Sequence, residues 1–493
     1  MHNTKRISPK YKKALIAIFA IFLVFDISFS FVQYYHQSFD GDVVENVAPA
    51  NYIKPILNDP IGLNVLIKGD SGVNPNRFFS LWTYKTYFEK VPIFLQNFLS
   101  PIDSIYSSAA IFKIFVQIGL IFLLSLFITK TPKFWKFNFL LSALLVSLFF
   151  QTNVYSIYLG IIDSSITYVF YYAFPFMLLM LYLVPFVFNK DIQNKKILNT
   201  TLRVLAIPFA FVVCLSGPLN PGAAIIISLL ALLRIVLKNI KSQQNNQAIN
   251  SKKLFIAIRN IPSHYWNYFM PLIILSLYSL YIGTFNSMWV SEEIPIKERY
   301  FNIHKGVFNI MTQKLGYPLL VVSIIINSIL IKYKYKSEKG TKILYNFNWL
   351  LLFILFYTLL LPLGGYRPYR PYILRYDTII PITICLVFMF GVSTMYLIQS
   401  VQKPFKIAYY FYILFIIFIY TNADRNIQLN SEKERKAMTL IAQSKDRIVK
   451  IPKDYKVLSW HNINSPQESE DKAKLLLSWN IIKEKKLFYN SNQ

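Results

Sequence analysis

Charged residues are scarce in this chain. Asp, Glu, Lys and Arg make up 15% of its 493 residues, whereas a soluble domain has roughly 25%. Several windows of about 18 to 22 residues are almost free of charge, long enough for a helix to cross a bilayer. Lipid offers the backbone no hydrogen-bond partners, so such segments must be helical. The sequence therefore excludes a soluble globular protein and predicts an all-α polytopic membrane protein.

Cysteine and the common catalytic signatures are also scarce. The only cysteines, Cys214 and Cys385, both lie in apolar segments, which argues against a disulfide framework or a thiolate metal site. The chain contains no Gly-rich phosphate loop, no HExxH, no GxSxG and no paired CxxC. Chemistry driven by ATP or by zinc therefore has no support in the sequence.

Acidic residues are fewer than half as numerous as basic ones, and the net charge is +28. Much of the Lys and Arg falls in short loops between apolar segments, which is typical of cytoplasmic loops in membrane proteins. We therefore expect a membrane-lipid environment and no nucleic-acid partner. The first apolar run, after Lys5 to Lys13, is long for a signal peptide and no small-x-small site closes it. It predicts an uncleaved first span with its N-terminus inside.

The apolar segments predict about eleven transmembrane helices in residues 1–421 and a multi-pass protein of the cytoplasmic membrane. A long first outer loop, residues 35–107, contains aromatic, amphipathic stretches that we expect to form interface helices. Residues 422–493 predict a small soluble α/β tail outside, with a helix in SEKERKAMTLIAQSKDRIV and a strand in DYKVLSW. The expected spans are 14–34, 108–129, 137–152, 167–188, 203–217, 221–238, 266–285, 316–332, 346–363, 378–399 and 406–421.

Two carboxylates flank a glycine just after the first span, in SFDGDVVEN. If the backbone is extended there, Asp40 and Asp42 point the same way. Such a pair either holds a divalent cation or supplies a general base whose pKa its neighbour raises. Glu45 faces the same side if a helix begins after Asp42. The alternative is a solvated Asp-Gly turn. No cofactor other than such a cation is indicated.

A second polar stretch, GGYRPYRPYILRYDT, lies between two apolar segments. Arginine recognises phosphate by paired hydrogen bonds, and the prolines stiffen the backbone that presents Arg367 and Arg370. We expect these two residues, with Arg375 and Asp377, to bind an anionic ligand. The alternatives are headgroup anchoring and an internal salt bridge. Arg77, in the first outer loop, is a candidate for a further phosphate contact.

This layout resembles the C superfamily of membrane glycosyltransferases, which use polyprenyl-phosphate-linked sugars. Those proteins place an acidic motif in a long first outer loop, the position that FDGDVVEN takes here. The resemblance implies that Asp40 or Asp42 acts as base or binds metal, and that Arg367, Arg370 or Arg375 meets the lipid-linked phosphate. It also implies a bacterial cell-envelope enzyme that transfers a sugar to a glycan, lipid or protein acceptor. The arginine-rich stretch itself is not part of the family's pattern.

Other functions fit the same layout. A transporter or flippase of lipid-linked saccharides would need ionisable residues at mid-membrane, and the expected spans hold almost none beyond Arg234 and Lys113, both near span ends. A saccharide polymerase uses outer-loop arginines, and an assembly subunit would have no chemistry. The enzyme hypothesis requires Asp40 and Asp42 to face the arginines across one outward cavity. The sugar, the acceptor and the oligomeric state do not follow from the sequence.

Overall fold

A computed structural model describes residues 9–49, 51–69, 72–188, 196–242, 251–287, 294–364 and 372–491 of the chain. Its described part is almost entirely helical, with two short strands near the C-terminus. The fold is therefore all-α, as the sequence predicts.

Among the described residues, the first half of the chain has one long helix and then four helices within residues 35–107, the predicted first outer loop. A second long helix follows, after which helices of different lengths alternate with short turns. The helices are α1 (Pro9–Tyr35), α2 (Asp42–Val47), α3 (Lys54–Leu57), α4 (Leu63–Lys68), α5 (Phe78–Leu95), α6 (Pro101–Thr129), α7 (Phe137–Ser147), α8 (Ser156–Leu159), α9 (Ile166–Tyr168), the π-helix Val169–Ala173, α10 (Phe174–Val187), α12 (Lys196–Cys214) and α13 (Asn220–Ser242).

The second half adds further long helices and ends in the tail. These elements are α14 (Ser251–Arg259), α15 (Ser263–Gly283), α16 (Ile296–Thr312), α17 (Gly316–Ile329), the π-helix Leu330–Lys334, α18 (Glu338–Leu360), the 3-10 helix Leu361–Leu363, α19 (Ile380–Ser400), α20 (Phe405–Ala423), α21 (Glu432–Gln443), β1 (Ile448–Ile451), the 3-10 helix Pro466–Ser469, α22 (Glu470–Ser478) and β2 (Leu487–Asn490).

Eight helical stretches of the described residues are long and apolar enough to cross a membrane, the pattern of a multi-pass membrane protein. They contain α1, α6, α9 with α10, α13, α17, α18, α19 and α20. Three further predicted spans also contain helices, namely α7, α12 and α15, of which α7 and the apolar part of α12 are shorter. The total of eleven spans therefore stays a prediction.

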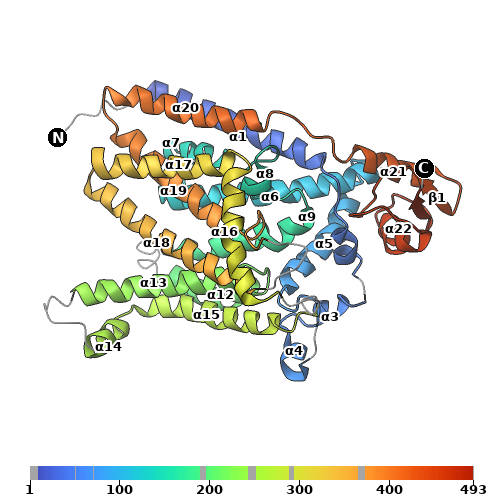
Figure 1. Ribbon diagram of the computed structural model, residues 1–493, viewed down its shortest axis with the longest axis horizontal. Helices are drawn as coiled ribbons and strands as arrows, with labels where there is room; N and C mark the ends of the chain where they lie inside the picture. Colours follow the sequence, from blue (N-terminus) through green and yellow to red (C-terminus); the bar gives the residue numbers. More distant parts are fainter. Residues whose placement is uncertain are drawn as a thin grey trace.

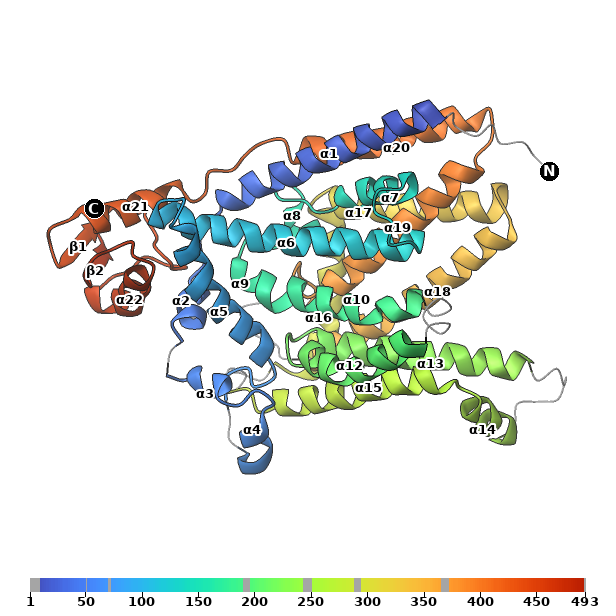
Figure 2. The same ribbon diagram turned by 180° about the vertical axis from the view of Figure 1, so that it is seen from behind.

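The long helices run side by side, and the tail lies at one end of them (Figures 1 and 2). We call this end the tail side. Helix α6 lies centrally and packs against α1, α5, α7 and α10, while α12, α13 and α15 pack together. Helices α5 and α16 cross the direction of the long helices at a steep angle (Figure 1). The amphipathic stretch WTYKTYFEKVPIFL thus forms one helix, α5, as expected.

The tail contains two helices and a parallel two-stranded sheet in which Ile448 pairs with Leu487. The predicted helix in SEKERKAMTLIAQSKDRIV is confirmed as α21, but the predicted strand in DYKVLSW is wrong. Those residues form turns, and Leu458 has a positive φ of 50°, which no strand contains. Val457 and Leu458 are consecutive and both buried, so burial in this segment does not alternate as it does in a half-buried strand.

Candidate functional site

The turn Asp40–Gly41–Asp42 lies on the tail side, directly after the first long helix. Gly41 has φ −70° and ψ −19°, and α2 begins at Asp42. The extended geometry considered for this stretch is therefore wrong, because the backbone already turns into a helix. The Asp40 carboxylate accepts a hydrogen bond of 3.0 Å from the Asp42 N–H, which satisfies a donor that a helix start leaves unpaired.

The protein surrounds Asp40 with donors. Its carboxylate accepts hydrogen bonds from the Ser165 hydroxyl at 2.5 Å and the Thr167 hydroxyl at 2.8 Å. Burial raises the pKa of Asp40, and the hydrogen bonds from Ser165 and Thr167 partly oppose that rise. Both oxygens are engaged within the protein, so Asp40 is placed to hold the first outer loop against the start of α9.

A divalent cation between Asp40 and Asp42 does not fit this geometry, because protein donors already occupy both Asp40 oxygens. The part of the chain that the structure describes also contains no cluster of three or more His, Cys, Asp or Glu suited to a metal ion. With both of its oxygens engaged, Asp40 suits neither the chelate nor a base that meets substrate, and Asp42 is the more accessible acid of the turn.

Asp42 differs from Asp40 because it is partly exposed. Its carboxylate accepts a hydrogen bond of 3.0 Å from the indole N–H of Trp460 in the tail. Glu45 lies one turn further along α2 and is exposed, so both acids share a helix face, as expected for a helix that begins here. The Tyr52 hydroxyl lies close to Glu45, and burial together with that carboxylate raises the pKa of Tyr52.

Arg77 approaches the same short helix from the start of α5. Its guanidinium carbon lies 5.5 Å from the centre of the Tyr171 ring. The Tyr171 hydroxyl in turn donates a hydrogen bond to the side chain of Asn46 in α2. The Tyr171 side chain thus connects Arg77, the proposed phosphate contact, to α2, the helix that carries Asp42 and Glu45.

A buried lysine lies between two buried acids on the other side of Asp40. Lys113 of α6 donates hydrogen bonds to the Gln37 side chain and the Ser164 carbonyl. Its charge acts on both Asp163 and Asp40. One Asp163 oxygen accepts a 2.7 Å hydrogen bond from the Ser165 N–H. The other, Oδ2, is buried and has no hydrogen-bond partner among the residues that the structure describes.

The pKa of Asp163 is raised from its usual value to about 7. Burial is the largest cause of its raised pKa, and the charge of Asp377 adds to the rise, whereas Lys113 opposes it. Asp163 and Lys113 are therefore a buried pair of opposite sign in which the lysine opposes the effect of burial on the carboxyl group.

The arginine-rich stretch reaches this cluster through its last residues. Arg375 forms an ion pair with the buried Asp377, the pairing that the sequence allowed. The Tyr376 ring lies 6.5 Å from the ring of Tyr168, which follows Thr167. Arg375 and Asp377 thus lie close to Asp163, on the tail side. Arg367 and Arg370 lie outside the described residues.

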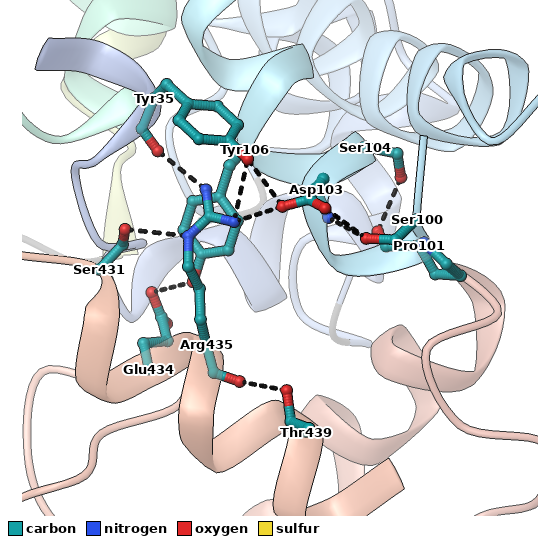
Figure 3. Close-up of polar contacts among 10 residues, drawn as sticks. All are labelled: Tyr35, Ser100, Pro101, Asp103, Ser104, Tyr106, Ser431, Glu434, Arg435 and Thr439. Atoms are coloured by element: carbon teal, nitrogen blue, oxygen red, sulfur yellow. Dashed lines mark hydrogen bonds and ion pairs between the residues drawn. The ribbon is translucent and has the colours of Figure 1, made fainter. Parts of the chain in front are cut away.

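Two consecutive residues of α21, Glu434 and Arg435, bind the tail to the end of α1 and the start of α6 (Figure 3). Arg435 donates to the Asp103 carboxylate at 2.7 Å and to the Tyr35 carbonyl at 3.0 Å. Its guanidinium also lies 3.7 Å from the centre of the Tyr106 ring. The buried Glu434 accepts hydrogen bonds from the Tyr106 hydroxyl and the Phe39 N–H. The end of α1, the start of α6 and the tail therefore form one packed unit.

Two cavities are lined by described residues, and neither lining includes Asp40, Asp42, Asp163 or Asp377. One, of about 320 Å³, lies between the end of α2, α5 and α22. It is lined by Val47, Ala48, Pro49, Glu89, Lys474, Leu475, Ser478 and Trp479. The other, of about 430 Å³, is lined by residues near α8 and the end of α20. The tail thus bounds a hollow beside the helix that carries Asp42 and Glu45.

Sequence reasoning missed several of these residues. Glu434 and Arg435 belong to a charged run that reads as a solvated helix face, and Trp460 belongs to the wrongly predicted strand. Asp26 is an acid inside the first apolar run and joins Arg234 and Lys113 as an ionisable residue within the expected spans. It lies in α1 beside Ser147 of α7.

A comparison with known protein families finds no match to this chain, and a comparison with curated proteins finds none either.

Proposed function

We propose that this protein transfers a sugar from a polyprenyl-phosphate carrier to an acceptor on the outer face of the cytoplasmic membrane. One observation carries the proposal. The acidic turn after the first long helix and the Arg375–Asp377 segment, far apart in sequence, meet on the tail side around Lys113 and Asp163. Acids and cations of this kind suit transfer with an anionic leaving group.

The distribution of lysine supports an outward-facing site. Basic residues lie in the loops after α6, after the π-helix that follows α17 and after α19, and at the end of α13, and Figure 1 has these places at the end opposite the tail. Cytoplasmic loops concentrate Lys and Arg, so we place the N-terminus inside and the tail outside. This orientation requires an odd number of spans, as the eleven expected segments provide. The basic residues in these loops or in the adjoining helix ends include Lys130, Lys133, Lys136, Lys238, Lys241, Lys332, Lys334, Lys336, Lys403 and Lys406.

In the proposed reaction, the bond between the sugar's anomeric carbon and the carrier phosphate breaks, and a bond to an acceptor hydroxyl oxygen forms. Asp42 takes the acceptor's proton because it is the more accessible acid of the turn. Arg77 and Arg375 stabilise the polyprenyl phosphate that leaves. Asp40 holds the turn in place through Ser165 and Thr167. The prenyl chain lies between the long helices.

A second function, transport of a lipid-linked saccharide, is favoured by one observation. Asp26 is an acid within a helix of membrane-spanning length, and such residues mark transport or proton pathways. The transporter would move the intact saccharide lipid across the bilayer, whereas the enzyme would leave the bare carrier phosphate. The products therefore separate the two functions.

The experiment uses the full chain in vesicles that contain radiolabelled polyprenyl-phosphate sugars and cell-envelope acceptors. Asp42→Asn should lower the transfer rate by about 10²-fold or more. Asp446→Asn, an exposed acid of the tail, is the control and should leave the rate unchanged. Full activity of Asp42→Asn would remove the catalytic assignment. Movement of labelled lipid without release of its sugar would replace the enzyme by the transporter.

A further inference from the structure

A loop of the tail lies directly on the acidic turn. A Cβ atom at Gly41 would come within 2.6 Å of Cδ1 of Trp460 and 2.9 Å of its backbone nitrogen. The Trp460 indole N–H donates to the Asp42 carboxylate at 3.0 Å. The ring is therefore held against the turn from two directions, by close backbone approach and by a hydrogen bond along its edge.

A single buried carboxylate fixes this loop relative to the turn. Glu434 accepts a 2.9 Å hydrogen bond from the Leu458 N–H, two residues before Trp460. It also accepts one of 2.9 Å from the Phe39 N–H, one residue before Asp40. The two segments thus share one anchor, so the position of Trp460 relative to Asp42 is set by the fold of the tail.

The two tryptophans of the tail differ in a way that indicates different roles. Trp479 is 1% exposed, packs against Phe39 and Phe88 and donates its N–H to the Phe88 carbonyl. It is part of the packed contact between tail and helices. Trp460 is 45% exposed even though its polar edge is engaged. The Trp460 side chain is thus fixed at its edge and still nearly half exposed, unlike that of Trp479.

The groups around Trp460 match the chemistry of a sugar ring. One face of a saccharide ring presents C–H groups that stack on an aromatic face, whose electron density is negative. Its hydroxyl groups donate hydrogen bonds to carboxylates. Asp42 touches the indole, and Glu45 lies on the same helix face as Asp42. An open indole beside these two acids therefore suits a neutral saccharide better than an anion.

We propose that Trp460 binds the acceptor, and that the acceptor at this position is a saccharide. The proposal rests on the proposed function in one respect, the role of Asp42 as the group that takes the acceptor's proton. Because Trp460 contacts that same carboxylate, a ring stacked on the indole presents its hydroxyl to Asp42. The tail thereby contributes to substrate choice.

The test combines direct binding with kinetics on the full chain in lipid nanodiscs. Four disaccharides (maltose, cellobiose, mannobiose and chitobiose) serve as soluble probes in a tryptophan-fluorescence titration. Trp460→Phe identifies the part of any signal that comes from this ring, and Trp135→Ala, an exposed tryptophan between α6 and α7, is the control. Sugar transfer to the same disaccharides is then measured for Trp460→Ala and Trp460→Phe.

We expect at least one disaccharide to change the fluorescence of the wild type and to lose that effect in Trp460→Phe. Trp460→Ala should raise the acceptor KM about tenfold, with kcat changed less than about threefold and the donor KM unchanged. Trp460→Phe should lie between the two, because it keeps a ring. Trp135→Ala should match the wild type.

The outcomes separate this inference from the proposed function. Transfer by the wild type with an unchanged acceptor KM in Trp460→Ala would overturn the inference alone. Disaccharide binding through Trp460 without any transfer would support the inference and overturn the proposed function. The absence of both binding and transfer would overturn both. Limited proteolysis of each variant shows whether the tail is still docked, and Trp460→Phe provides the comparison if Trp460→Ala is not.

Discussion

Glu434 Oε2 accepts a hydrogen bond of 2.9 Å from the backbone N–H of Phe39, a residue 395 positions earlier in the chain. The other oxygen of this carboxylate accepts the Leu458 N–H. A single side chain near the end of the sequence therefore holds both the segment before Asp40 and the loop that carries Trp460. The integrity of the candidate site depends on the docked tail.

Removing this carboxylate should loosen the tail. Glu434→Ala leaves the buried N–H groups of Phe39 and Leu458 without their acceptor, which costs about 1–3 kcal/mol for each. The Tm of the purified protein should fall, and trypsin should cut the tail faster. Glu432→Ala, two residues earlier and exposed, should change neither. Wild-type protease resistance of Glu434→Ala would show that the tail is held by other contacts.

The same residue makes tail docking depend on pH. Burial raises the pKa of Glu434 from 4.5 to about 7, against the effect of its hydrogen-bond donors. A raised pKa in the folded state stabilises that state at low pH and loses this effect as pH rises through the folded value. The stability difference between wild type and Glu434→Gln, which cannot titrate here, should therefore shrink from pH 4.5 to 7. A pH-independent difference in Tm would contradict this.

Substitutions at Asp40 and Asp42 should affect different properties, protein stability in the first case and sugar transfer in the second. Asp40→Asn replaces a carboxylate oxygen by an amide facing hydroxyl and N–H donors, so the Tm should fall by several degrees. Asp42→Asn alters a partly exposed side chain and should leave the Tm unchanged while sugar transfer falls. Thermal unfolding and transfer are measured on both variants. Equal loss of stability in the two would contradict the different roles assigned to them.

Lys113 and Asp163 should be energetically coupled. Lys113→Met leaves the Asp163 carboxyl buried without its neighbouring cation, and Asp163→Asn leaves the ammonium with one acid fewer. The double variant should be more stable than the sum of the single effects by about 1 kcal/mol or more. Thermal unfolding of the four proteins gives the coupling, with Lys133→Met as a lysine control in an exposed loop. Strict additivity would show that the two charges act independently.

Gly41 should tolerate no side chain, for steric reasons alone. Its φ of −70° suits any residue, but a Cβ would crowd the Trp460 ring and backbone. Gly41→Ala should therefore cost about 1–3 kcal/mol and expose the tail to protease. Gly222→Ala is the matched control, because nothing lies within 4 Å of a Cβ there and alanine favours a helix. An unchanged Gly41→Ala protein would place Trp460 further from the turn.

The sequence predicted the long helices because apolar composition and length decide them locally, and every expected span contains a helix. It also predicted that Asp42 and Glu45 share a face once a helix begins. It could not distinguish Glu434 from Glu432, since both lie in one charged run and only the fold buries the first. The sequence also did not predict that Lys113 and Asp163 lie close together, because neither residue's neighbours in sequence indicate the other.

The dependence of the acidic turn on Glu434 and Trp460 has a consequence for the order of events in biosynthesis. Phe39, Asp40 and Asp42 are made early, but their partners in the tail are translated only after α20. The turn therefore lacks its contacts with Glu434 and Trp460 until all the helices between them have been made. A ribosome that stops after α20 would release a chain with its long helices complete and its acidic turn unassembled. The acidic turn can therefore reach its full packing only after the tail, the last part of the described chain, has been made.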